Sequence, residues 1–213
     1  MKQPCPPDRK DKSLPVLEAA ATVFLAHGFS AATTDMIQRE AKVSKATVYA
    51  CFPNKEALFA AVIERECAEM AETVRAIGIA PGNIARTLTD LGLSYLRIVL
   101  SPTGLALFRV VVADAVRFPD LARTFYLAGP KVIHHMIAER LEVAARAGEI
   151  DVQAIGFEGA AAQFVSVLRG EGQLECLTHP DAHPSTEQLD RWVRMAVTTF
   201  LAAFGTGNRP PLT

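Results

Sequence analysis

The 213-residue chain carries 22 Lys/Arg and 23 Asp/Glu, a formal net charge of −1, so total charge alone does not indicate a nucleic-acid partner. Half of its residues are hydrophobic and 7% are aromatic, which predicts a well-buried, mainly helical core. No apolar run reaches the roughly 18 residues that a membrane span needs, and the first residues lack the apolar segment of a secretory signal. We therefore expect a cytoplasmic protein without a membrane partner.

Charge is unevenly distributed along the chain. Residues 1–55 hold eight Lys/Arg and five Asp/Glu, a net of +3, and residues 56–213 hold fourteen and eighteen, a net of −4. The modest basic excess means that any affinity for DNA depends on a few placed contacts and on dimerisation.

The cysteines are scattered and show no CxxC spacing: Cys5, Cys51, Cys67 and Cys176. Reduced thiols are the expectation, rather than a disulfide framework or a zinc site. A redox switch at Cys51 is one interpretation, and a small buried residue is the favoured one.

The N-terminal segment 1–12 contains three prolines and mixed charge, which predicts a mobile tail. Ser13 can cap a first helix over 14–27, with Pro15 tolerated in its first turn. Gly28 ends this helix because glycine readily adopts the left-handed conformation.

Residues 33–55 predict two short helices joined by a polar turn. Thr34 is the expected cap of the first, and residues 42–44 interrupt the helical spacing. Ser44 can cap the second, which runs from Lys45 to about Cys51 and buries Val48. This pattern is typical of a helix-turn-helix, whose second helix enters the major groove of DNA.

Helix follows helix in the remainder of the chain. A long helix over 55–77 would span about 30 Å, enough to connect a DNA-binding head to a second domain. Further helices are predicted over 84–100, 103–117, 119–128 and 131–147. The segment 103–117 is apolar nearly all round, which predicts a central position.

The C-terminal part is predicted to end in two helices whose small-residue and apolar faces must pack against other parts of the protein. Asp151 can cap a helix to about residue 169 that is rich in small residues. A loop region is expected at 170–172 and 178–184, and Ser185 with Gln188 forms a capping box. The apolar stripe of the last helix would be covered by a partner subunit or by the chain itself.

The stretch VLEAAATVFLAHGFSAATTDMIQREAKVSKATVYACFPNKEALFAAVI, about a quarter of the chain, resembles the N-terminal domain of the tetracycline-repressor (TetR) family of transcriptional regulators. The segment RFPDLARTFY is similar to the AefR-like branch of that family. The matching positions of the first stretch are Ala19, Ala20, Phe24, Gly28, Phe29, Thr33, Thr34, Ile37, Ala41, Val43, Ser44, Thr47, Tyr49, Phe52, Lys55, Glu56, Ala57 and Leu58.

The resemblance implies an all-α homodimer: a three-helix helix-turn-helix DNA-binding head plus a larger helical ligand-binding and dimerisation domain. We place the head at 13–59, the effector-binding and dimerisation domain at 60–207 and tails at 1–12 and 208–213. Such proteins are usually repressors that bind palindromic operators in double-stranded DNA and are released by a small-molecule effector. The effector is expected to be partly apolar.

The family pattern assigns DNA contacts to eight positions. These are Thr33, Thr34, Ser44, Lys45, Ala46, Thr47, Tyr49 and Lys55. Thr33 or Thr34 would meet a phosphate, Lys45 and Thr47 would lie nearest base edges, and Tyr49 and Lys55 would contact phosphates. Many members have glycine in place of Ala46, so its methyl limits backbone approach, and DNA shape is expected to contribute to recognition.

Two further sets of residues are expected from their position in the family's second domain. The effector-pocket candidates are Tyr95, Phe108, Phe118, Phe125, Tyr126 and His134. The dimer-interface candidates, from the two C-terminal helices, are Gly159, Gln163, Trp192, Val197, Phe200 and Phe204.

Histidines stand at short spacings in two places, His134–His135 before Glu139, and His179 before His183. No third ligand is evident for either, so we expect no metal and no cofactor. A buried or pocket-lining histidine is the favoured interpretation of the first pair, and a sensing role there stays open.

Two other function classes remain as alternatives. A helical small-molecule-binding protein could carry a head that has lost DNA binding, but Lys45, Thr47, Tyr49 and Lys55 are all present. An enzyme is disfavoured because the sequence has no G-x-S-x-G elbow, P-loop or dinucleotide-binding glycine pattern. The effector, the operator, the regulated genes and the choice between repressor and activator are not encoded in any motif.

Overall fold

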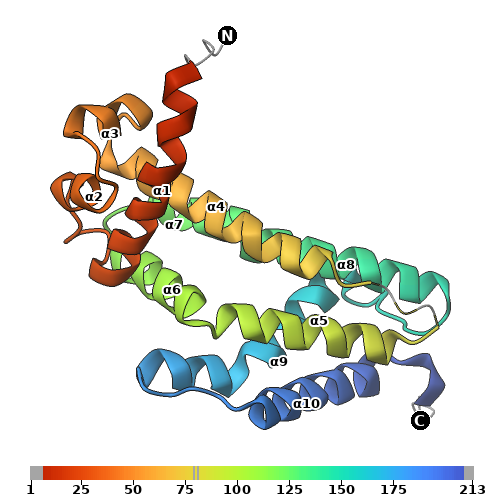
Figure 1. Cartoon of the computed structure of the whole chain (residues 1–213). Helices are drawn as coiled ribbons and strands as arrows, with labels where there is room; N and C mark the ends of the chain where they lie inside the picture. The colour runs from red at the N-terminus through yellow and green to blue at the C-terminus, as the bar shows by residue number, and fades with distance from the viewer. Residues whose placement is uncertain (1–6, 79, 81, 209–213) are drawn as a thin grey trace. The chain divides into compact units, whose positions relative to one another are not determined.

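A computed structural model describes residues 7–78, 80 and 82–208, and within these residues the fold is all-α, as the sequence predicts (Figure 1). One isolated bridge, Ile150 to Gly205, is the extended pairing among them. The helices are α1 (Pro7–His27), α2 (Thr34–Glu40), α3 (Lys45–Cys51), α4 (Lys55–Arg75), α5 (Ile84–Val99), α6 (Pro102–Asp114), α7 (Pro119–Ala128), α8 (Pro130–Arg146), α9 (Gly156–Thr178), α10 (Thr186–Phe204) and the short 3-10 helix Thr206–Asn208.

The chain divides into two compact units, which we call the head unit and the second unit. The head unit consists of the described residues in 1–68 and 106–129, and the second unit of those in 69–105 and 130–213. This division differs from the domain boundary predicted at 59/60, because most of α6 and all of α7 pack with the head. Each unit has its own apolar core.

Aromatic rings form the centre of the head unit. The Phe24, Phe29 and Phe59 rings lie with centroids 4.7–5.7 Å apart, and each side chain is at most 1% exposed. Phe118, which immediately precedes α7, places its ring edge-on to Phe29 at 4.7 Å. Such pairs add about 0.5–1.5 kcal/mol each beyond the burial of area, so residues distant in sequence belong to the head core.

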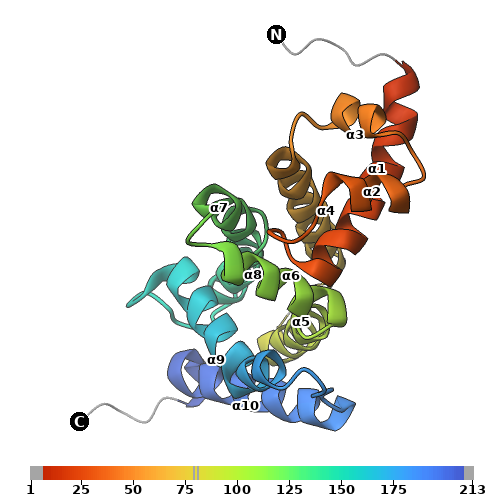
Figure 2. The same cartoon turned by 90° about the vertical axis from the view of Figure 1, so that its left-hand side faces the viewer.

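In the second unit, α5, α8, α9 and α10 pack together, and α9 and α10 lie side by side (Figure 2). α5 buries a stripe that includes Leu88, Leu91 and Leu96, the helical spacing of a core-facing helix. Between α9 and α10, the Phe164 ring meets Phe200 edge-on at 5.6 Å.

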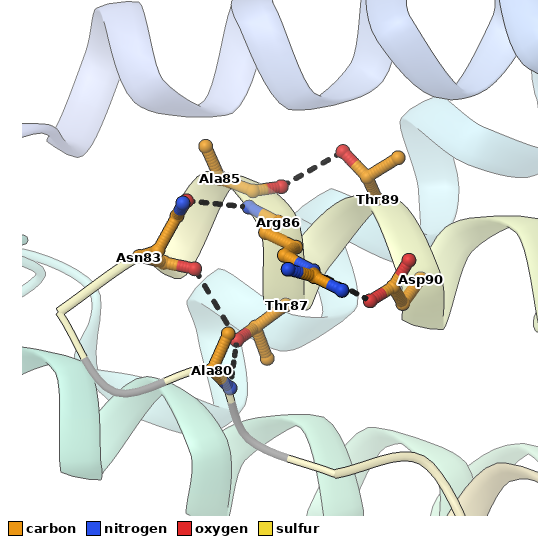
Figure 3. A network of polar contacts seen from close by, with 7 residues as sticks. All are labelled: Ala80, Asn83, Ala85, Arg86, Thr87, Thr89 and Asp90. Atoms are coloured by element: carbon orange, nitrogen blue, oxygen red, sulfur yellow. Dashed lines mark hydrogen bonds and ion pairs between the residues drawn. The ribbon is translucent and has the colours of Figure 1, made fainter.

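Polar contacts fix the start of α5 (Figure 3). Asn83 caps the helix by accepting the Arg86 amide at 3.0 Å, and the Thr87 hydroxyl accepts the Ala80 amide at 3.0 Å. The Ile84 amide donates a hydrogen bond to the Glu149 carboxylate at 2.7 Å. The bonds from Arg86 and Ile84 satisfy amides that the first turn of α5 leaves free, and the Thr87 bond holds the preceding residue Ala80 against the helix.

The N-terminal helix is longer than predicted. α1 begins at Pro7, so the tail predicted over 1–12 is wrong from residue 7 onward, and residues 1–6 lie outside the described part. Proline is favoured in a first helical turn because its fixed φ suits the helix and its missing N–H would be unpaired there. Pro15 then lies inside the helix, rather than near its start.

The predicted boundaries of the α9 region are also corrected. Asp151 does not cap a helix: its Oδ1 accepts the Gln153 amide at 3.1 Å in a turn, and α9 begins at Gly156. The loop expected at 170–172 is a kink at Gly170 (φ 26°, ψ −136°), after which the helix resumes to Thr178. Glycine absorbs the break within one residue because it tolerates positive φ.

The segment 103–117 is not buried all round. α6 ends at Asp114, and Val112 and Val116 are 56% and 96% exposed, so the predicted central position is wrong for its C-terminal part. Taken alone, no described helix is both long and apolar enough to cross a bilayer; α5 and α6 meet those criteria only jointly, across a 65° bend.

Two predicted dimer-interface residues are covered by their own chain. Val197 and Phe200 are 6% and 4% exposed in the core of the second unit, and the Phe204 ring packs on Phe200. Trp192 lies against Gly172 of α9. Helical periodicity identifies a buried stripe but not what covers it, and here α9 covers α10. Gly159 and Gln163 remain on less buried positions of α9.

Among the residues that the structure describes, Cys51, Cys67 and Cys176 form no disulfide. Burial raises the pKa of the Cys67 thiol to about 12, so this side chain stays protonated at neutral pH.

The close approach of Trp192 to Gly172 generates a stability prediction. A Cβ at Gly172 would lie 2.7–2.9 Å from three ring carbons of Trp192, so Gly172→Ala forces the ring to move. We expect a loss of about 1–3 kcal/mol in the free energy of unfolding, measured with urea. Gly159→Ala is the matched control on the same helix, where the nearest side-chain atom would be 3.5 Å away. The control should equal or exceed the parent in stability; equal stability of both variants would contradict the packing argument.

Candidate nucleic-acid interface

The two short helices α2 and α3 are capped by hydroxyl side chains. Thr33, rather than the predicted Thr34, caps α2 by accepting the Met36 amide at 3.2 Å, and Thr34 is the first helical residue. Thr33 has the extended backbone that a cap requires. Ser44 caps α3 as predicted, accepting the Thr47 amide at 3.1 Å.

The turn between the helices has the hydrogen bonds of a Schellman motif. The Val43 amide donates to the Gln38 carbonyl at 3.1 Å, and the Lys42 amide donates to the Arg39 carbonyl at 3.2 Å. The motif needs a left-handed residue, usually glycine, and here Lys42 adopts it with φ 53°.

Burial sets which side of α3 is presented to solvent. Val48 is 1% exposed and packs in the head core with Ile37 of α2. Lys45, Ala46 and Tyr49 are exposed, as the helix-turn-helix prediction requires. α2 and α3 both lie against α1, which supports them within the head unit (Figure 2).

Polar contacts link α3 to α2. The Lys45 ammonium lies 2.9 Å from Asp35 Oδ1, and this hydrogen bond raises the pKa of Lys45. The Tyr49 hydroxyl lies 3.4 Å from Thr34 Oγ1, and either can donate. The Lys45–Asp35 pair is about half exposed, so it is weak and exchangeable in solvent.

The Ser44 and Thr47 hydroxyls lie 2.9 Å apart at the start of α3. Ser44 also accepts the Thr47 amide, so this hydroxyl supports the helix as well as facing outward. Thr47 is half-buried beside it.

Lys55 has a structural role that its predicted phosphate contact did not anticipate. Its ammonium donates to the carbonyls of Phe29 (2.9 Å), Ala32 (3.0 Å) and Ser30 (3.5 Å), and lies 4.5 Å from the centroid of the Phe29 ring. The ammonium thus has three acceptors and an aromatic face within the head. Without DNA the cation holds the loop before α2, and the phosphate contact of Lys55 stays a prediction.

The same loop is held by residues of the 106–129 segment. Asp114 accepts the Ser30 hydroxyl at 2.6 Å through Oδ1 and the Ser30 amide at 3.2 Å through Oδ2. Arg117 donates to the Ser30 hydroxyl at 3.4 Å. Sequence reasoning missed these partners, because 84 residues separate Ser30 from Asp114 and no local pattern connects them.

The six predicted effector-pocket residues are divided between the two units. Phe108, Phe118, Phe125 and Tyr126 belong to the head unit, where Phe108 and Phe125 pack edge-on at 6.2 Å. Tyr95 and His134 belong to the second unit. The structure therefore does not gather all six within one compact unit.

Tyr95 and His134 of the second unit are both influenced by Arg169. Tyr95 is 5% exposed; burial raises the pKa of its phenol, against the opposing effect of a hydrogen bond with Arg169. His134 is half-buried, and burial lowers its pKa. Arg169 also donates to Gln173 across the kink in α9.

His135, beside His134, points to the surface. Its Nδ1 lies 2.9 Å from Glu158 Oε1, and this hydrogen bond raises the pKa of His135. Within the part of the chain that the structure describes, no group of three or more His, Cys, Asp or Glu side chains is arranged to hold a metal ion.

Two family models match the chain. One, for the AefR-like transcriptional repressor C-terminal domain, matches residues 86–206, and the other, for bacterial regulatory proteins of the tetR family, matches residues 16–62. The chain is also 39% identical over 59 residues to the HTH-type transcriptional repressor SCO4008 of Streptomyces coelicolor, which is 28% of this chain and 31% of that protein. This match thus spans about a third of the curated relative.

Solved structures extend the similarity over nearly the whole chain. The flavonoid-responsive regulator FrrA is 33% identical with a TM-score of 0.78, covering 93% of this chain and all of FrrA. A TetR-family transcriptional regulator from Mesorhizobium loti MAFF303099 has a TM-score of 0.85 at 23% identity, covering 93% and 98% of the two chains. The second match supports the fold.

The acceptors around Lys55 generate a prediction for the stability of the head. Lys55→Met keeps the aliphatic stem but leaves three carbonyls without their donor, so we expect a loss of about 1–3 kcal/mol in urea unfolding. Lys45→Met is the matched control, because it removes only an exposed ion pair and should leave the urea midpoint unchanged. An unchanged midpoint for Lys55→Met as well would mean that water replaces the ammonium at no cost.

Proposed function

Because this chain belongs to the TetR family of bacterial transcriptional regulators, we propose that it is a dimeric repressor released from a palindromic operator by a partly apolar small molecule. The observation that carries the proposal is the order of the two family matches, a DNA-binding head at 16–62 followed by an AefR-like domain at 86–206. Acting on an operator, the protein works in the cytoplasm. The family is one of regulators rather than enzymes.

The exposed side of α3 supports the DNA-binding role. Lys45, Ala46 and Tyr49 face solvent. Because the Lys45–Asp35 ion pair is exposed and therefore weak, the Lys45 ammonium can leave Asp35 at little cost in free energy and bind in the major groove. Of the two threonines, we propose Thr34 for the phosphate contact, since Thr33 is already used as a cap. Thr34 and Tyr49 would meet one phosphate together, because their hydroxyls lie 3.4 Å apart.

Ser44 and Thr47 complete the proposed groove contacts. Their hydroxyls lie together at the end of α3 that enters the groove first in helix-turn-helix docking. The exposed methyl of Ala46 on the same helix limits backbone approach. Direct base readout is thus restricted to few atoms, and DNA shape supplies part of the specificity.

For the dimer interface we propose the outer side of α9 and α10. Val167, Leu174 and Met195 are 48%, 62% and 59% exposed, although they are apolar. On α9, Val167 continues the helical spacing of Gly159 and Gln163, so the side that contains both predicted residues carries an exposed valine before the kink at Gly170. Exposed apolar side chains grouped in this way suit a second copy of the chain.

For the effector we propose an aromatic, partly apolar molecule that contacts Tyr95 and His134. FrrA, whose name describes it as flavonoid-responsive, is 33% identical over its whole length. The Tyr95–Arg169 pair would offer a hydroxyl and a cation to the phenolic oxygens of such a ligand, within an otherwise apolar core. The four predicted residues of the head unit stay untested as ligand contacts.

Binding to operator DNA tests the function. The purified protein should shift a palindromic fragment from the region of its own gene, and its affinity should fall as salt rises because phosphate contacts displace counterions. A flavonoid added to this complex should release the fragment. A protein that shifts no such fragment at low salt would favour the alternative of a small-molecule-binding protein. A complex that forms but resists every flavonoid would reject the ligand class and leave the repressor assignment standing.

The dimer surface is tested by charge insertion. Val167→Asp and Met195→Asp place carboxylates on the exposed apolar side of α9 and α10 and should give folded monomers in analytical ultracentrifugation, with unchanged helical circular dichroism. Val143→Asp, on a 43%-exposed valine of α8, is the matched control and should stay dimeric. Phe200→Asp cannot report on the interface, because its ring is in the core of the second unit. Dimeric Val167→Asp and Met195→Asp would refute this placement.

A further inference from the structure

Lys42 occupies a strained position in the turn between α2 and α3. It is the one non-glycine residue with positive φ (53°) in the described part of the chain. The Schellman motif places it at the position where glycine is the usual residue, because a side chain with a Cβ disfavours the left-handed conformation. Backbone strain that persists in a surface turn calls for a role of the side chain.

The Lys42 side chain is exposed, and among the residues that the structure describes no hydrogen bond or ion pair engages its ammonium. Its neighbours differ in this respect. Lys45 pairs with Asp35, the Lys55 ammonium donates to loop carbonyls, and Arg39 Nε donates to the Asp35 carbonyl at 3.0 Å. Lys42 thus meets an external anion without giving up an internal partner, whereas Lys45 must first leave Asp35.

Its place in the chain brings Lys42 to the proposed DNA surface. It lies two residues before Ser44, the cap of α3, and so at the end of α3 that carries Lys45 and Ala46. In helix-turn-helix docking the first residues of the recognition helix reach the base edges, and the segments around them meet the sugar-phosphate backbone. A flexible lysine just outside the helix is suited to a phosphate as a mobile point charge.

We infer that Lys42 binds a backbone phosphate of the operator and that the strained turn is retained for this contact. The inference rests on the proposed DNA-binding function. A phosphate fits better than a base edge, because Lys42 precedes the helix that enters the groove and a lysine ammonium binds phosphate well as a point charge. Affinity should thus depend on Lys42 equally at every sequence, and the protein gives up some fold stability for it.

The test is Lys42→Gly in the full chain, measured by fluorescence anisotropy on the operator fragment and on a random duplex between 50 and 200 mM salt. Glycine relieves the left-handed strain, so the melting temperature should rise by about 2–4 °C. Affinity at the lowest salt should fall about 3- to 10-fold on both duplexes. The slope of log K against log salt should become shallower by about one per protomer, because one phosphate contact is lost.

Two matched variants define the readout. Lys42→Arg keeps the charge and should retain the parent salt slope. Lys131→Ala removes an exposed lysine of the second unit and should change neither slope nor affinity. If Lys42→Gly binds with the parent affinity and slope, the inference is overturned, whatever its melting temperature. A loss confined to the operator would identify a base contact and overturn the phosphate assignment. A parent protein that binds neither duplex would instead refute the proposed function.

Discussion

The three carbonyls that accept from Lys55 are the constraint on which the head depends. Gly28 ends α1 and Thr33 caps α2, so the loop between them has carbonyls that no helix satisfies. The ammonium of Lys55, in the first turn of α4, donates to the carbonyls of Phe29, Ser30 and Ala32. Since Thr33 follows directly, the bond that closes this loop also sets where α2 begins. The orientation of the DNA-facing helices is thus fixed from α4, and the cation that appeared suited to DNA is used within the fold.

The loop is held a second time by residues beyond the predicted head. Asp114 takes both the hydroxyl and the amide of Ser30, and Phe118 packs its ring edge-on to Phe29. The head unit is therefore more than three helices, because its core is completed by the segment 106–129. The chain enters that segment inside α6, which starts at Pro102 in the second unit. A change in the course of α6 would thus act on the loop that precedes α2.

Local signals made most helices and the family predictable from sequence. Ser44 and the Ser185–Gln188 capping box are correct because a cap is decided within four residues. Prediction from sequence is limited where the deciding partner is distant or where two neighbouring residues fit one signal. Thr33 and Thr34 both suit a cap, charge alone does not separate the internal role of Lys55 from a phosphate contact, and a buried stripe around Phe200 does not reveal whether α9 or a second subunit covers it.

Internal use of the cations explains how a chain of net charge −1 is suited to DNA. The excess of +3 in residues 1–55 overstates the charge available, because the ammonium of Lys55 is engaged by carbonyls and that of Lys45 is shared with Asp35. Hydroxyl groups then make up much of the surface that we propose for DNA binding, in the pairs Thr34–Tyr49 and Ser44–Thr47. Hydroxyls position a protein on the phosphates but discriminate bases weakly, since they can donate to or accept from several base edges. In the dimer that we propose, selectivity would therefore come from the spacing of the two heads and from the energy of deforming the DNA between them.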